Sequence, residues 1–229
     1  SGGCIAAAVG WVHLWTTLHR RGAISSKVSR KIIHCGSGPL FMLLWPLFSP
    51  LPTARYVAAI VPFLQAVRLT LAGLGRGGND LAAAVAREGD AREALQGPLL
   101  YVLVLTAGTV LEWRTSMVGL LAICQMAAGD GLADLVGRRF GGVKWWFSKD
   151  KSYVGSLAFM VGGFAVSMAL VAWFHAAGCL ALSPAAAALR IAAVSLACAL
   201  VEVAPVAGDD NVSVPVAAAV LSRLLFPEM

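Results

Sequence analysis

Two acids and two arginines stand close together in the segment GDGLADLVGRRFGG, residues 129–142. On a helix, Asp130 and Asp134 are four positions apart and share one face. Like charges at that spacing repel each other, and a divalent cation would offset the repulsion. Mg²⁺ prefers carboxylate oxygens together with water and substrate phosphates, whereas a solvated helix end is the simpler explanation of the same pair. The segment therefore offers a candidate magnesium site.

A basic loop follows these acids. Its charged residues are Arg138, Arg139, Lys144, Lys149 and Lys151, against Asp150 alone. Arginine binds phosphate oxygens through a bidentate fork, and lysine binds them as a point charge. A loop with this charge would also suit contact with lipid headgroups. Its position beside the two acids favours metal–nucleotide chemistry instead.

A second acidic stretch, GDDNVSVP at 208–215, precedes the last apolar run. Asp209, Asp210 and Asn211 are adjacent and point in different directions, so that one can bind a metal while another meets substrate. Glu202 ends the preceding apolar run, and an acid at membrane depth is a functional candidate because its burial is costly.

A further cluster stands near the N-terminus, where Arg30, Lys31 and His34 fall at helical spacing. A lone histidine is more often structural than catalytic, so these three residues are secondary candidates.

Composition decides what kind of fold carries these residues. Of the 229 residues 59% are hydrophobic and 13% charged, whereas soluble domains average about 25% charged residues. A soluble fold of this length could not hide so much apolar surface, so we expect an integral membrane protein. The formal net charge of +6 comes from basic residues between apolar runs. This is the pattern of positive-inside loops, and we expect no nucleic-acid partner.

Eight apolar runs predict the architecture, an all-α polytopic transmembrane bundle of about seven to eight spans. They lie at about 4–18, 36–49, 54–74, 98–113, 115–129, 153–176, 185–204 and 212–226. We expect a single integral membrane domain over 1–229, with an N-terminus that is truncated or processed because the chain begins without Met.

The polar segments between these runs should meet on one membrane face. They lie at 19–34, 75–97, 137–152 and 201–215, and two apolar runs separate each from the next. An even number of crossings returns the chain to the same side. The basic residues predict that this is the positive-inside face.

Five stretches, in order along nearly the whole chain, resemble the polyprenol kinase family, the phytol and farnesol kinases of plants and cyanobacteria. They are RKIIH (30–34), AREALQGPLLYVLVL (91–105), GDGLADLVGRRFG (129–141), KDKSYVGSLA (149–158) and VEVAPVAGDDNVSVP (201–215). The resemblance implies a multi-span plastid membrane enzyme that moves the γ-phosphate of CTP, with Mg²⁺, onto an isoprenoid alcohol. Phytol is the preferred substrate, as in phytol salvage for tocopherol synthesis, and farnesol and geranylgeraniol remain open.

The resemblance also points to site residues. Asp130, Asp134, Asp209 and Asp210 are the candidate catalytic acids, with Asp130, Asp134 and Asp210 as metal ligands. Which acid accepts the alcohol proton stays open. The expected nucleotide or phosphate contacts are Arg138, Arg139, Lys149, Lys151, Ser152, Gly155 and Asn211, with Gly137 and Glu202 also matching the family pattern.

Two alternatives remain. A more distant similarity to CDP-diacylglycerol synthases would make the chain a cytidylyltransferase. A small-solute transporter would carry its charges near the bilayer midplane and show repeat symmetry, whereas here the charges gather at span ends.

Overall fold

The computed structural model describes residues 2–76, 90–204 and 209–228, so the middle of the 75–97 segment and part of the 201–215 segment lie outside the described residues. The regular elements of the described chain are helices, which confirms the all-α prediction. They are α1 (Gly2–Arg20), α2 (Ser26–Leu43), α3 (Ala54–Gly73), α5 (Gly97–Leu111), α6 (Met117–Cys124), α7 (Asp130–Phe140), α8 (Tyr153–Ala176), α9 (Pro184–Val203) and α10 (Asp210–Leu225), with short 3₁₀ turns η1 (Trp45–Leu47) and η2 (Ala91–Leu95).

A π-helical turn, η3 (Gln125–Gly129), joins α6 to α7. Counted with this turn as one helix, α6–α7 brings the number of long helices among the described residues to eight. π-turns inside α-helices often occur at functional sites. Here the turn ends directly before Asp130, the first residue of α7.

Five of the helical segments in the described ranges are long and apolar enough to cross a membrane. They are 54–73, 91–111, 117–140, 153–176 and 184–203. The other three expected spans fall in α1, α2 and α10, which do not reach the same length and apolarity. In α2 the charges of Lys27, Arg30 and Lys31 interrupt the apolar sequence, and α10 has only 16 residues. The described residues thus contain five candidate spans, where the sequence predicts seven to eight.

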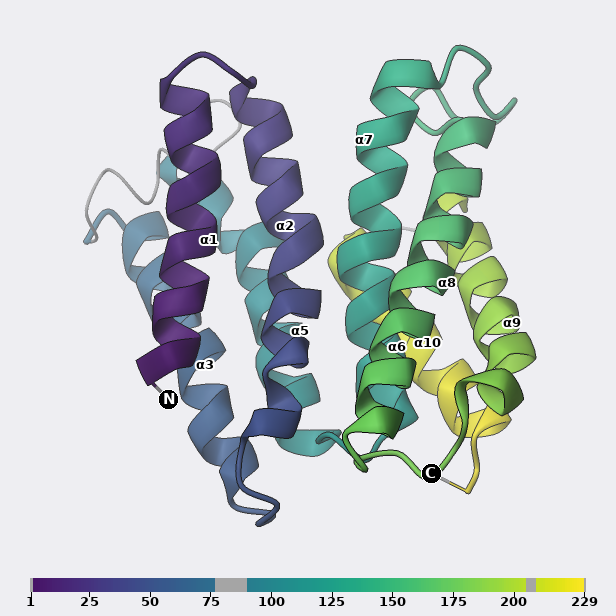
Figure 1. Cartoon of the computed structure of the whole chain (residues 1–229). Helices are drawn as coiled ribbons and strands as arrows, with labels where there is room; N and C mark the ends of the chain where they lie inside the picture. The colour runs from purple at the N-terminus through teal and green to yellow at the C-terminus, as the bar shows by residue number, and fades with distance from the viewer. Residues whose placement is uncertain (1, 77–89, 205–208, 229) are drawn as a thin grey trace.

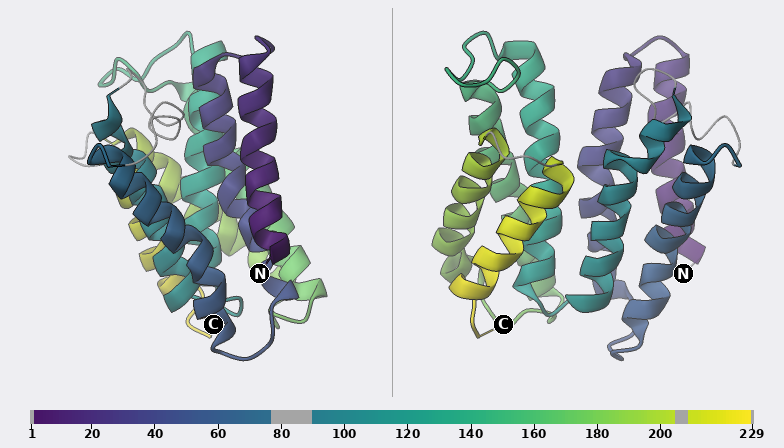
Figure 2. Two further views of the ribbon diagram at one scale, coloured as in Figure 1. Left: turned by 90° about the vertical axis from the view of Figure 1, so that its left-hand side faces the viewer. Right: turned by 180° about the vertical axis from the view of Figure 1, so that it is seen from behind.

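The helices form two groups (Figure 1). One group contains α1, α2, α3 and α5, and the other contains α6–α7, α8, α9 and α10. The two groups meet where α2 packs against η3 and α7, and where α5 packs against α6 and α10. The view from behind, on the right of Figure 2, shows α5 and α10 at this seam.

The α6–α7 helix is the centre of the bundle. All eight residues of α6 are buried, and Met117, Leu120 and Ile123 are fully enclosed in the hydrophobic core. This packing holds the following turn and the start of α7 in place. Asp130 is therefore anchored by the most deeply packed helix of the fold.

Local sequence signals set the helix ends near the site. Ser152 is the N-cap of α8, and its Oγ accepts a hydrogen bond from the Gly155 amide at 3.1 Å. Asp209 caps α10 in the same way through the Asn211 amide at 2.8 Å. Such caps satisfy amides that have no partner within the helix.

Candidate active site

A polar cavity of about 430 Å³ lies where the ends of five helices converge. Its lining comes from α2, α7, the loop 141–152, α8, α9 and α10. The charged residues lining it are Lys31, Asp130, Asp134, Arg138, Lys144, Asp150, Lys151, Glu202 and Asp210, with Ala133, Gly137, Ser152, Gly155 and Ser156 between them. Three of the four polar segments in the sequence thus contribute to one site, together with Asp130 and Asp134 of the central helix. The even number of apolar runs between the segments predicts all four on one membrane face, and the described part of 75–97 does not line this cavity.

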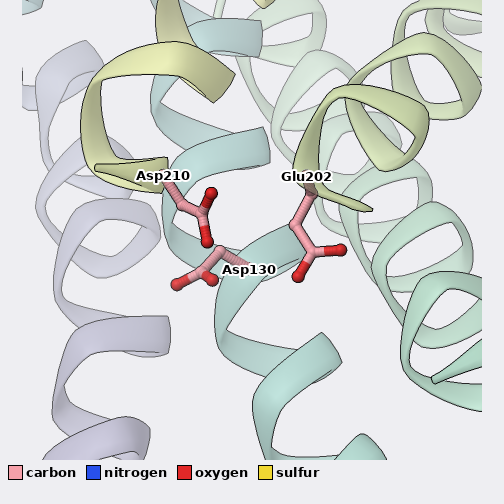
Figure 3. Close-up of side chains that lie close together, drawn as sticks. All are labelled: Asp130, Glu202 and Asp210. Atoms are coloured by element: carbon pink, nitrogen blue, oxygen red, sulfur yellow. The ribbon is translucent and has the colours of Figure 1, made fainter. Parts of the chain in front are cut away.

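Three carboxylates form the centre of this cavity. Asp130, Glu202 and Asp210 each offer an oxygen, and these oxygens all lie within 4.8 Å of one another. The side chains point toward each other from three helices (Figure 3). We call these three residues the acid cluster. Oxygen ligands gathered this closely can hold a divalent cation.

The acid cluster differs from the expected metal set in one position. Asp134 was expected beside Asp130 and Asp210, but the cluster contains Glu202 instead. Asp134 lies one helical turn further along α7, where its Oδ1 accepts a hydrogen bond from Arg138 Nε at 2.6 Å. Asp130 and Asp134 share a helix face, yet they bind different partners.

Lys151 neutralises part of the acid cluster. Its Nζ lies 2.5 Å from Glu202 Oε1 and 2.7 Å from Asp210 Oδ2. Burial lowers the pKa of Lys151, but the Glu202 and Asp210 carboxylates raise it by more, so the pKa of Lys151 stands above its usual value. Lys151 is therefore a cation throughout the physiological range.

Asp130 is held from the other side by α2. Lys31 Nζ lies 2.7 Å from Asp130 Oδ2, and His34 Nε2 lies 3.3 Å from the same oxygen. Tyr101 supports His34, because its hydroxyl donates to the His34 carbonyl oxygen at 2.9 Å and accepts from the Gly38 amide at 2.8 Å. The Lys31 and His34 pair thus connects the RKIIH segment to the acid cluster, while Arg30 lines a different cavity.

The start of α8 forms the cationic wall of the cavity. The Ser152 cap leaves the positive end of the α8 dipole facing the site, which favours bound anions. Gly137 and Gly155 let α7 approach this end, since a Cβ on Gly155 would lie 3.0 Å from Ser152 Oγ and 3.2 Å from the Ala133 carbonyl oxygen. Any larger residue there would push the two helices apart.

The positions of three basic residues in and beside the loop could not be predicted from the sequence. Lys144 lines the cavity and donates to the Asp150 carbonyl oxygen at 3.0 Å. The predicted phosphate contacts Arg139 and Lys149 are exposed and do not line it. The Arg139 guanidinium instead lies 5.5 Å from the centre of the Phe140 ring. Charge alone does not distinguish the lysines and arginines that line the cavity from those that do not.

Asp209 and Asn211 face away from the polar cavity. They line a second cavity, together with Gln96 and Gly97 at the start of α5. Asn211 Nδ2 donates to Asp209 Oδ1 at 2.6 Å, so that the two side chains form a pair. Adjacent residues of the GDDN stretch therefore serve two cavities, with Asp210 in the first and its neighbours in the second.

This second cavity is a long, mostly apolar groove of about 1370 Å³. It runs between α1, α2, α3 and α5 and is lined largely by Ala, Val, Leu, Phe, Trp and Pro side chains. Lys31, Asp134 and Arg138 line both cavities, and we call these three residues the junction. The apolar residues of the groove could not be predicted from the sequence, because apolar side chains in membrane helices carry no distinguishing pattern.

Comparisons with known proteins identify the family of this chain. No protein-family profile and no solved structure matches the chain. The chain is 42% identical over 224 residues to a probable chloroplastic phytol kinase of Triticum aestivum, covering 96% of this chain and 75% of that protein. It is 39% identical over 225 residues to the chloroplastic phytol kinase 1 of Arabidopsis thaliana, covering 97% and 74%.

A third relative is a kinase named for a different alcohol. The chain is 39% identical over 215 residues to the chloroplastic farnesol kinase of Arabidopsis thaliana, covering 93% of this chain and 70% of that protein. Both kinds of kinase are thus matched across nearly all of the sequence. The cavity, its acid cluster and the adjoining groove lie in a chain that belongs to the phytol and farnesol kinase family of enzymes.

Proposed function

We propose that this protein transfers the terminal phosphoryl group of CTP, bound with Mg²⁺, to the hydroxyl of phytol in a plastid membrane. The observation that carries the proposal is the junction, where three shared residues line both a charged cavity and a mostly apolar groove. A kinase for a lipid alcohol needs this combination, because a water-soluble nucleotide must meet an oily acceptor at the membrane surface. CTP is the donor that the sequence resemblance implies, and the names of the relatives support the alcohol and the organelle.

The acid cluster fits a magnesium ion. Its three carboxylates come from rigid helix ends and supply oxygen donors only, which is the ligand type that Mg²⁺ prefers. Asp130, Glu202 and Asp210 would hold the ion, while nucleotide phosphates and water complete its shell. The ion would supply charge neutralisation on the phosphate oxygens.

The cationic wall binds the phosphates. Lys151, Lys144 and Arg138 surround the cavity together with the amide end of α8. Lys151 in this structure contacts two acids of the cluster, so binding of a cation there frees its ammonium group to contact a phosphate oxygen. Fixed positive groups of this kind stabilise the charge that spreads over a transferring phosphoryl group.

Asp134 accepts the proton of the alcohol. It is the acidic residue, among those the structure describes, that lines both cavities. The alcohol oxygen attacks the γ-phosphorus, its proton passes to the Asp134 carboxylate, and CDP leaves. Arg138 holds Asp134 in place through the 2.6 Å contact. Asp209, which caps α10 and pairs with Asn211, orients the polar end of the groove.

A donor and acceptor matrix tests the proposal. Purified protein in detergent or nanodiscs receives each of four γ-labelled nucleoside triphosphates with phytol, farnesol or phosphatidic acid. We expect label in phytyl phosphate with CTP as the best donor, together with release of CDP. Pyrophosphate release with phosphatidic acid would instead assign a cytidylyltransferase. Asp134→Asn tests the base, since it should lower phytol phosphorylation and remove the acidic limb of the pH profile, whereas near-normal turnover would exclude Asp134 from this role.

A further inference from the structure

The groove has a measurable depth below the junction. Residues that line it on α2 and its end run from Arg30 to Leu44. A helix rises 1.5 Å per residue, so these fourteen steps correspond to about 21 Å. The groove is therefore a channel with a defined length along the helix axis.

The polarity of the groove changes along that length. Charged and amide groups lie around the junction, where Arg30, His34 and Gln96 join it. At the far end the lining from α2 is apolar, with Leu43 and Leu44, whereas α3 contributes the polar Gln65 and Arg68 as well as Val61, Pro62 and Leu64. An occupant with one polar end, directed to the phosphate cavity, and a long apolar tail fits most of this lining.

Contacts between α1 and α2 set the depth of each α1 residue. Ser29 Oγ donates to the Trp15 carbonyl oxygen at 3.0 Å. A turn or two further down, the Trp11 ring lies against Gly36, where a Cβ would come within 2.3 Å of it. Gly10 thus lies near the level of Gly36, about 8 Å below Lys31 along α2.

Ala7 lies deeper in the same groove. It precedes Gly10 by three residues on α1, which runs antiparallel to α2, and so falls near the level of Pro39. This level is about 12 Å below Lys31. Both positions have small residues that line the groove and are exposed, and a Cβ on Gly10 would meet no atom within 4 Å. Side chains added there would enter the channel.

Leu43 lines the groove about 18 Å below Lys31, deeper than Ala7. We propose that this groove holds the prenyl chain and that its depth selects the chain length of the alcohol, with Leu43 as a specificity-determining position at its floor. The inference rests on the proposed kinase function. An extended isoprene unit adds about 5 Å, by the geometry of a fully extended chain. The four units of phytol reach about 20 Å, close to the depth of the groove, whereas the three of farnesol end about 5 Å higher.

Filling the groove at two depths tests this assignment. Leu43→Trp fills the floor and should lower kcat/KM for phytol about tenfold or more while leaving farnesol much less affected, in the range that pocket sterics produce. Ala7→Phe and Gly10→Phe obstruct levels that both alcohols pass, so they should lower kcat/KM for both. Leu47→Trp is the matched control for Leu43→Trp, because Leu47 is exposed four residues later and does not line the groove.

The phytol-to-farnesol ratio decides the outcome. A lower ratio in Leu43→Trp, with the ratio unchanged in Leu47→Trp, supports the groove as the prenyl site. Equal ratios in wild type, Leu43→Trp and Leu47→Trp would overturn it. If Leu43→Trp lowers the yield of folded protein, Leu43→Phe gives the same comparison with a smaller side chain. Wild-type protein that phosphorylates no alcohol would refute the proposed function itself, which separates the two failures.

Discussion

Replacing Lys151 by alanine should destabilise the protein because it leaves two acids without their cation. Glu202 is only 5% exposed and Lys151 is 30% exposed, so this contact is largely shielded from water. Removing one partner of a buried ion pair costs about 3–5 kcal/mol. The partial exposure of Lys151 places the expected loss near the lower end, about 3 kcal/mol, and Asp210, at 36% exposed, adds little.

This loss should be visible in thermal unfolding. For a chain of this size, about 3 kcal/mol corresponds to a decrease in Tm on the order of 10 °C. Lys149→Ala is the matched control, since Lys149 lies two residues earlier in the same loop, is exposed and does not line the cavity. Thermal unfolding in one detergent, followed by fluorescence of the tryptophans, compares the two variants directly.

A double variant separates stability from catalysis. In Lys151→Ala with Glu202→Gln no buried carboxylate is left without a cation, so most of the lost Tm should return. Activity should not return, because the phosphate contact of Lys151 is still missing and the acid cluster has lost one carboxylate. We expect kcat/KM to be about 10²–10³-fold lower in Lys151→Ala, with a larger effect on nucleotide KM than on alcohol KM, and no higher in the double variant.

Two results would refute this reasoning. If Lys151→Ala unfolds at the same temperature as Lys149→Ala, Lys151 does not neutralise the acid cluster. If the double variant recovers phosphoryl transfer together with stability, Lys151 supports the fold and has no phosphate to bind.

Three further predictions concern the same cavity. Asp130→Asn should abolish phosphoryl transfer and leave membrane insertion intact, and near-normal turnover of this variant would exclude the metal role. Asp130→Glu should keep some activity, with a higher Mg²⁺ requirement in a metal titration. The pKa of Lys151 is raised above its ordinary 10.5 in the folded protein, so its contribution to stability is complete below pH 10.5 and is lost only as pH rises through the higher folded value. The Tm difference between wild type and Lys151→Ala should accordingly not decrease between about pH 7 and 9, and a decrease there would contradict the charge assignment. Gly155→Val should force α8 away from α7, lower the Tm by an amount equivalent to about 1–3 kcal/mol and impair nucleotide binding, whereas Gly142→Val, at a position where a Cβ meets nothing within 4 Å, should do neither.

The fold class and the order of the helices along the chain could largely be predicted from the sequence. Hydropathy is a local property, so the apolar runs identified membrane helices without any knowledge of their packing. The even number of runs between polar segments then predicted that all four, 19–34, 75–97, 137–152 and 201–215, lie on one membrane face, and three of them line the polar cavity. The cap at Ser152 and the charges beside it also belong to a short stretch of chain and depend little on distant contacts.

The membership of the site was harder to predict. Asp130 and Asp134 stand at the spacing of a shared helix face, and this suggested a common metal. Their actual partners differ: Lys31 and His34 from α2 contact Asp130, while Asp134 pairs with Arg138 of its own helix. Glu202 joins the acid cluster only because α9 ends beside α7.

The sequence by itself determined that this chain is a helical membrane protein of the kinase family type, with its charged segments on one face. The tertiary structure decided that Glu202 rather than Asp134 completes the acid cluster. It also decided that Lys144 lines the cavity in place of Arg139 and Lys149, and that a mostly apolar groove shares the junction residues with that cavity. The physical reason is that hydropathy and charge are written residue by residue. The rotation of each helix about its axis, including the change introduced by the π-helical turn before Asp130, depends on how all the helices pack together.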